Sequence, residues 1–153
     1  MTKMREGRTK APVQNKMKSE ISQAALDGER RKPCPSASTL LIRNLQDVFG
    51  ENDPTRRRAA IDEIFTEDSV LYDPKSGAHR GRDEIDRVAG AIKATHPDFR
   101  YQPIAEPEEL GNAGRVRWVS GHPGEAPAYA GTDFLTARDG RIAAIYLFFD
   151  KLP

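Results

Sequence analysis

The hydrophobic positions along the chain change their spacing from three or four residues to two, which divides a helical part from a sheet part. In the helical part, Leu41 and Leu45 lie on one face of a helix that Gly50 can end. Asp53 is suited to cap a second helix, and Pro54 is suited to its first turn. The sequence therefore predicts two helices between residues 38 and 65.

After a short strand at residues 69–74 and a third helix at residues 82–96, polar and apolar residues alternate, which is typical of strands. The pair Asp139-Gly140 is a strong signal for a two-residue hairpin turn. The later strands are expected at residues 99–106, 115–121, 128–138 and 141–150. This order predicts an α+β fold, in which helices cover one side of a curved antiparallel sheet of about four to six strands.

Asp133 interrupts one of these strands, where aspartate is normally depleted. If the Asp139-Gly140 turn pairs Arg138 with Arg141, regular pairing places Asp133 opposite Tyr146. Because side chains alternate between the two faces of a strand, Asp133 is then expected to share its face with a mixed set of residues. These are Tyr129, Gly131, Leu135, Ala144, Tyr146, Phe148 and Asp150.

The face expected around Asp133 has the composition of a small-molecule site, with aromatic walls, few polar groups and a glycine beside an acid. A carboxyl group held there would have a raised pKa and could donate a proton or a hydrogen bond. Two alternatives stay open: a buried aspartate that only bonds a tyrosine hydroxyl or backbone amides, or an exposed aspartate at the sheet margin.

Charge is distributed unevenly along the chain. Residues 1–37 carry nine lysines and arginines and four acidic residues, so they have a net charge of +5. We interpret them as a flexible basic N-terminal tail, either a tether for an anionic partner or a disordered extension. Residues 38–153 have a net charge of −4, so we expect no binding of nucleic acid through bulk charge.

The composition indicates a cytoplasmic protein that does not enter a membrane. No apolar run approaches the roughly 20 residues that a membrane span needs. Cys34 is the only cysteine, so the chain has no internal disulfide, which fits a reducing compartment. The three histidines are far apart in sequence and have no cysteine partner, so we expect no metal site.

Several short motifs occur in a characteristic order. The segment F-x-x-D-x-V-x-Y-D-P spans Phe65 to Pro74 and is followed by G-R-D-E-I; R-V-R-W, G-T-D-F, D-G-R-I and Y-L-F-F-D come later. Together they resemble the SnoaL-like branch of the nuclear transport factor 2-like superfamily over residues 38–153. The resemblance implies a cone-shaped α+β fold with three N-terminal helices, a central apolar pocket and, commonly, a homodimer.

The resemblance also implies two functional carboxylates. In the ketosteroid isomerases of this superfamily, the catalytic base lies in a V-x-D-P segment, which here falls on Asp73. Their second, protonated aspartate falls on Asp133. Their tyrosine on the first helix has no counterpart between Arg43 and Gln46, which speaks against steroid isomerisation. Asp73 has a rival explanation, because Asp-Pro commonly ends a strand.

We therefore expect a protein that binds an apolar, oxygen-bearing small molecule, with Asp73 and Asp133 as candidate catalytic residues and no cofactor. The rival hypotheses are a non-catalytic ligand-binding or dimerisation module, and a partner surface on the other face of the hairpin. That face is expected to carry Phe134, Ile145, Leu147 and Phe149. The expected pocket residues are Tyr72, His79, Trp118, Tyr129, Gly131, Tyr146, Phe148 and Asp150.

Overall fold

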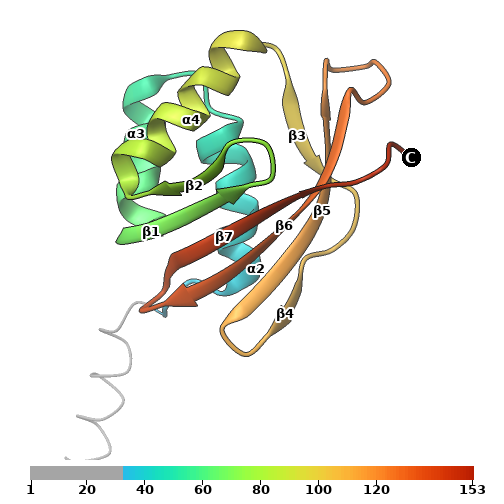
Figure 1. The fold of residues 1–153 in the computed structure, drawn as a ribbon. Helices are drawn as coiled ribbons and strands as arrows, with labels where there is room; N and C mark the ends of the chain where they lie inside the picture. Colours follow the sequence, from blue (N-terminus) through green and yellow to red (C-terminus); the bar gives the residue numbers. More distant parts are fainter. Residues whose placement is uncertain (1–32) are drawn as a thin grey trace, which may run out of the picture. The chain divides into compact units, whose positions relative to one another are not determined.

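The computed structural model describes residues 33–153. Most of the predicted basic tail lies outside these described residues, and its role stays a prediction. Residues 34–153 form one compact unit, in which helices lie on one side of a curved sheet (Figure 1).

The helices begin where local chemistry favours them. Helix α2 (Ala37–Arg43) starts after Ser36, whose hydroxyl accepts a hydrogen bond from the Thr39 amide, and it continues into the π-helix η1 (Asn44–Phe49). Helix α3 (Pro54–Ile64) is capped by Asp53, as predicted: the carboxylate accepts the Arg56 amide at 2.9 Å. Helix α4 spans Arg82–Thr95. The three predicted helical regions are confirmed.

The strands form a single open sheet of seven strands in the order β2-β1-β7-β6-β5-β3, with β4 beside β5. Their bounds are β1 Phe65–Asp73, β2 Gly77–Arg80, β3 Arg100–Pro103, β4 Glu108–Leu110, β5 Ala113–Gly121, β6 Tyr129–Arg138 and β7 Arg141–Phe149. The α+β fold is confirmed, but the sheet has more strands than predicted and is mixed, because β1 pairs with β7 in parallel. Periodicity reports which face of a strand is buried and carries no information about its partner.

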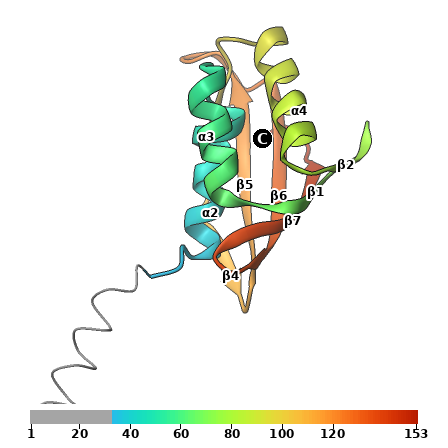
Figure 2. The ribbon, with the colours of Figure 1, turned by 90° about the vertical axis from the view of Figure 1, so that its left-hand side faces the viewer.

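One face of the sheet carries the helices, and the hydrophobic core lies between these two layers (Figure 2). Helix α2 packs on β5 and β6, while α3 packs against η1 and α4. The sheet contributes alternate residues to this inner face. Those from β5, β6 and β7 include Val116, Trp118, Leu135, Ile142 and Ile145, all almost fully buried.

A β-bulge in β7 sets which residues accompany Asp133. The turn is as predicted, since Asp139 and Gly140 both have positive φ and Arg138 pairs with Arg141. Ala137 pairs with Ile142 but Thr136 pairs with Ala144, so one residue of β7 has no partner and the register shifts. Asp133 therefore lies opposite Leu147, and the predicted pairing with Tyr146 is wrong.

The shift by one residue exchanges the two faces of β7 beyond the bulge. Ile145, Leu147 and Phe149 are on the inner face with Asp133, whereas Tyr146 and Phe148 are on the outer face. The predicted partner surface is thus also wrong, except for Phe134, which is on the outer face and contacts Tyr146.

The register can be tested with paired cysteines in a Cys34→Ser background. Thr132→Cys with Phe148→Cys joins partners of the observed register, whose Cα atoms lie within the reach of a disulfide. Thr132→Cys with Leu147→Cys joins partners of the bulge-free register. We expect mild oxidation to cross-link the first pair and leave the second pair as free thiols, measured by thiol labelling and mass spectrometry. The opposite result would contradict the bulge.

Candidate functional site

A small cavity lies between η1, helix α4 and the inner face of the sheet. Its volume is about 80 Å³, and apart from a few polar groups its walls are apolar. The lining residues are Asn44, Leu45, Phe49, Leu71, Asp73, Val88, Ile92, Tyr101, Trp118, Asp133, Ile145, Leu147 and Phe149. We call it the inner cavity. It brings the two candidate carboxylates, Asp73 and Asp133, to one site.

Asp133 is the most deeply buried acidic group of this cavity, with only 5% of its surface exposed. One carboxylate oxygen accepts a hydrogen bond from Trp118 Nε1 at 2.9 Å, and the other accepts from Asn44 Nδ2 at 3.2 Å. Burial raises the pKa of Asp133 to about 6, although both hydrogen bonds act in the opposite direction. This carboxyl group therefore changes its charge close to physiological pH.

Two backbone features hold these donors in place. Asn44 opens the π-helix η1, an element that often marks functional sites, and its side chain is completely buried. Trp118 pairs across the sheet with Gly131, where any Cβ atom would overlap the indole ring. Gly131, predicted as a pocket residue, thus makes room for the indole that binds Asp133.

Asp73 lies at the end of β1 and is partly exposed. Its Oδ1 accepts hydrogen bonds from the amides of Lys75 and Ser76, at 2.7 and 3.3 Å, so it does form the strand-ending turn that was its rival explanation. It also lines the inner cavity. The two explanations are therefore compatible. The turn amides hold Oδ1 of Asp73 in a fixed orientation, and the same residue lines the inner cavity.

Tyr101 of β3 brings a phenol to this cavity that sequence reasoning missed. Its ring packs edge-on against Trp118, at a centroid distance of 5.1 Å, and against Phe49 at 6.3 Å. Burial, together with the charge of the nearby Asp133 carboxylate, raises the pKa of Tyr101 to about 12. The phenol therefore stays protonated and can donate a hydrogen bond.

Asn44 was also missed, although it lies in the segment where the superfamily resemblance suggests a tyrosine. Its Oδ1 is buried and has no hydrogen-bond partner among the described residues. The sequence did contain a signal for Asn44, because a polar residue on the apolar face of a predicted helix is unusual and can indicate a site. For Tyr101 the alternation in β3 gave no comparable signal.

Four predicted pocket residues do not line the inner cavity. Tyr72 and Tyr146 stack on each other on the outer face, with centroids 4.7 Å apart. Phe148 is also on the outer face and is 56% exposed, and Asp150 accepts a hydrogen bond from Thr132 of the outer face at 2.7 Å. The bulge explains why Tyr146, Phe148 and Asp150 are on the outer face and not in the cavity. For Tyr72, the alternation of side chains along β1 explains it.

Two further predicted residues, His79 and Tyr129, do not line the inner cavity either. His79 of β2 is buried and bonds Ser76 Oγ through Nε2 at 2.8 Å, with Nδ1 3.6 Å from Glu84. Tyr129 is 39% exposed and packs with the rings of His96 and Phe99. Of the eight pocket residues expected from sequence, Trp118 lines the cavity and Gly131 shapes its wall.

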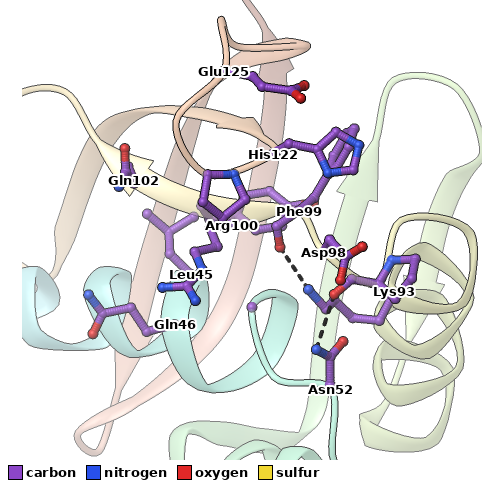
Figure 3. Close-up of a pocket in the computed structure, with 14 residues that line it drawn as sticks. Leu45, Gln46, Asn52, Lys93, Asp98, Phe99, Arg100, Gln102, His122 and Glu125 are labelled. Atoms are coloured by element: carbon purple, nitrogen blue, oxygen red, sulfur yellow. Dashed lines mark hydrogen bonds between the residues drawn. The ribbon is translucent and has the colours of Figure 1, made fainter.

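A larger, open hollow adjoins the inner cavity, and Leu45 and Tyr101 line both. Figure 3 shows this hollow. We call it the vestibule. Its volume is about 850 Å³, and it lies between the end of η1, the end of α4, β3 and the loop after β5. Its walls are mostly polar and include Lys93, Asp98 and Arg100.

Among residues 33–153, no group of three or more histidine, cysteine or acidic side chains is arranged to hold a metal ion. No helix in the same range is long and apolar enough to cross a membrane.

The SnoaL-like domain family model matches residues 42–145, about two thirds of the chain and nearly all of the elements described above. The chain belongs to this family. Among curated proteins, none matches it significantly.

Solved structures support the assignment of this SnoaL-like domain. A proposed isomerase of the SnoaL-like family from Agrobacterium tumefaciens is 25% identical, with a TM-score of 0.69, over 75% of this chain and 97% of that chain. A proposed polyketide cyclase from Sinorhizobium meliloti is 26% identical, with a TM-score of 0.55, over 71% and 93%.

A third structure, from Catenulispora acidiphila, has a ketosteroid isomerase-like fold and was solved in complex with trimethylamine. It is 16% identical, with a TM-score of 0.59, over 72% of this chain and 85% of that chain. At this identity the likeness shows the fold alone.

The raised pKa of Asp133 predicts a pH-dependent stability difference. Because the folded state binds the proton more tightly than the unfolded state, Asp133 contributes stability that is fully present below its unfolded pKa and is lost as the pH rises through about 6. We expect the unfolding free energy of the wild type, relative to Asp133→Asn, to fall by about 2 kcal/mol between pH 4.5 and 7.5.

Urea unfolding at several pH values, followed by circular dichroism, measures this difference. Asp150→Asn on the outer face is the matched control and should show no such trend. A difference between wild type and Asp133→Asn that is constant with pH would show that the carboxyl group is not buried as described.

Proposed function

We propose that the protein binds a small, apolar, oxygen-bearing molecule and catalyses proton transfer next to its carbonyl group, without a cofactor. The observation that carries this proposal is that Asp73 and the deeply buried Asp133 line the same apolar cavity. A neutral acid and a base across one cavity are what proton abstraction beside a carbonyl requires.

In this mechanism Asp73 is the general base. Its Oδ1 is held by the turn amides, which leaves Oδ2 to take a proton from the carbon next to the carbonyl. Negative charge then develops on the carbonyl oxygen. The proton returns from Asp73 to a different carbon in an isomerisation, or to the same carbon in simple exchange.

Asp133 and Tyr101 stabilise the developing oxygen anion. Neutral Asp133 donates its proton into a hydrogen bond, and a ligand that expels water from the cavity favours this neutral form. Tyr101 supplies a phenol from β3, where the superfamily resemblance suggests a tyrosine from the first helix. Trp118 and Asn44 position the Asp133 carboxyl group through their two hydrogen bonds.

Hydrogen–deuterium exchange of butanone in D₂O tests the reaction without knowledge of the natural substrate. We expect the wild type to accelerate exchange beside the carbonyl, as followed by proton NMR. Asp73→Asn should lower the enzymatic rate by about 10²-fold or more, because it removes the base. The wild-type rate should fall as the pH rises above about 6, the pKa of Asp133.

Asp150→Asn, an acid of the outer face, is the control and should retain the wild-type rate. Equal rates for wild type and Asp73→Asn would overturn the catalytic proposal. If the protein binds ketones without accelerating exchange, the rival reading of a non-catalytic binding module holds instead.

A second proposal concerns the outer face of the sheet, which we suggest forms a homodimer interface. Phe134, Tyr146 and Phe148 line a shallow groove there, and Phe148 is 56% exposed. Phe134 and Tyr146 are half-buried beside it, and a cluster of aromatic side chains at the surface is typical of protein–protein contacts. The outer face of β6 and β7 would pair with its own copy.

Sedimentation equilibrium at micromolar concentration tests this interface. We expect the wild type to be a dimer and Phe148→Glu to be a monomer, because the substitution buries a charge in the contact. Leu110→Glu is the control, since Leu110 is 85% exposed on β4, away from the groove. A monomeric wild type would contradict the proposal.

A further inference from the structure

The size of the inner cavity limits how much of a ligand it can hold. A volume of about 80 Å³ corresponds to roughly three water-sized groups. Pockets that enclose whole small-molecule ligands usually measure about 300–1,000 Å³. Only one end of a ligand therefore fits beside Asp133, and the remainder must lie outside the inner cavity.

The vestibule is the space available for that remainder. It shares the lining residues Leu45 and Tyr101 with the inner cavity, so it is the adjacent hollow on the other side of these two side chains. With about 850 Å³ it is ten times larger, and its walls are polar where the inner cavity is apolar. A ligand that fits both has an apolar end and a polar end.

The charges in the vestibule indicate the polarity of that second end. Among the described residues, the guanidinium of Arg100 has no hydrogen-bond or ion-pair partner. In the view of Figure 3, the Arg100 side chain extends toward the side of the vestibule where Leu45 and Gln46 lie, whereas Asp98 and Lys93 lie on the other side. Leu45 also lines the inner cavity, so the unpaired cation extends toward the Leu45 side of the vestibule.

The two cations of the vestibule, Lys93 and Arg100, differ in whether they already have a partner in the protein and so in whether they are free to bind a ligand. The ammonium of Lys93 donates to the carbonyl of Phe99 at 2.8 Å and interacts electrostatically with Asp98. Arg100 has no such compensation. Its planar fork of donors matches a carboxylate in a bidentate geometry, and Gln46 and Gln102 offer further amide donors on the same side.

We propose that the ligand is a carboxylic acid, whose apolar, carbonyl-bearing end enters the inner cavity and whose carboxylate binds Arg100 in the vestibule. This inference rests on the proposed function, because it takes the inner cavity as the reactive site. It adds the substrate class, an amphipathic oxo acid, and a residue that selects it.

The probes are 5-oxohexanoate and its uncharged amide, 5-oxohexanamide, which have the same ketone end and nearly the same shape. Trp118 is the only tryptophan and lines the inner cavity, so its fluorescence reports entry of the ketone end. We expect the acid to bind the wild type at least about tenfold more tightly than the amide. Its affinity should fall as salt is added, because the vestibule is open to solvent.

Arg100→Gln should remove the preference for the acid and leave the affinity for the amide unchanged. Arg117→Gln is the matched control, since Arg117 is exposed on β5 with its side chain on the outer face. It should retain the preference. Equal affinity of acid and amide for the wild type, or a preference that survives Arg100→Gln, would overturn the inference.

Asp133→Asn separates this inference from the proposed function. If this variant loses affinity for both probes while Arg100→Gln changes nothing, the inner cavity is the site and the carboxylate contact is wrong. If Asp133→Asn and Asp73→Asn leave binding and ketone exchange unchanged, the proposed function is wrong. The acid-binding inference, which depends on it, then also falls.

Discussion

The buried carboxyl group of Asp133 is the constraint around which the site is arranged. Removing an acid from water is unfavourable unless its oxygens are hydrogen-bonded, and Trp118 and Asn44 supply one bond to each oxygen. Each donor is held in place by a further structural feature. The indole of Trp118 fits only because residue 131, opposite it in the sheet, is a glycine, and the amide of Asn44 reaches Asp133 only because its helix packs on the sheet. Helix, β5 and β6 are thereby connected at a single side chain.

These two hydrogen bonds do not fully compensate for burial, and this residual cost has chemical consequences. Asp133 titrates near pH 6, and the adjacent Tyr101 phenol is held protonated. Asp73, by contrast, is partly exposed and bound by turn amides. Two carboxyl groups in different environments at one cavity are suited to different roles, one as a proton or hydrogen-bond donor and one as a base.

The two hollows differ in size and polarity. The inner cavity has room for a small apolar group beside Asp133, whereas the vestibule is larger, open and polar. Tyr101 lines both hollows, so in the proposed binding mode its ring lies between the reactive end of the ligand and its polar end. Solved structures with the same fold have different proposed activities, an isomerase and a polyketide cyclase, so the fold alone does not determine specificity and the residues that line the site do.

The sequence by itself determined the helices, the alternation of the strands, the Asp139-Gly140 turn and the family resemblance, because each is encoded by residues close together in the chain. It also pointed to Asp73, Asp133 and Trp118. Only the tertiary structure decided which side chains surround Asp133. The β7 bulge falls in a pair of alanines that carries no signal, and it exchanges Tyr146 and Phe148 for Leu147 and Phe149. Asn44 and Tyr101 reach the site from segments distant in sequence, and their positions follow from how helix and sheet pack.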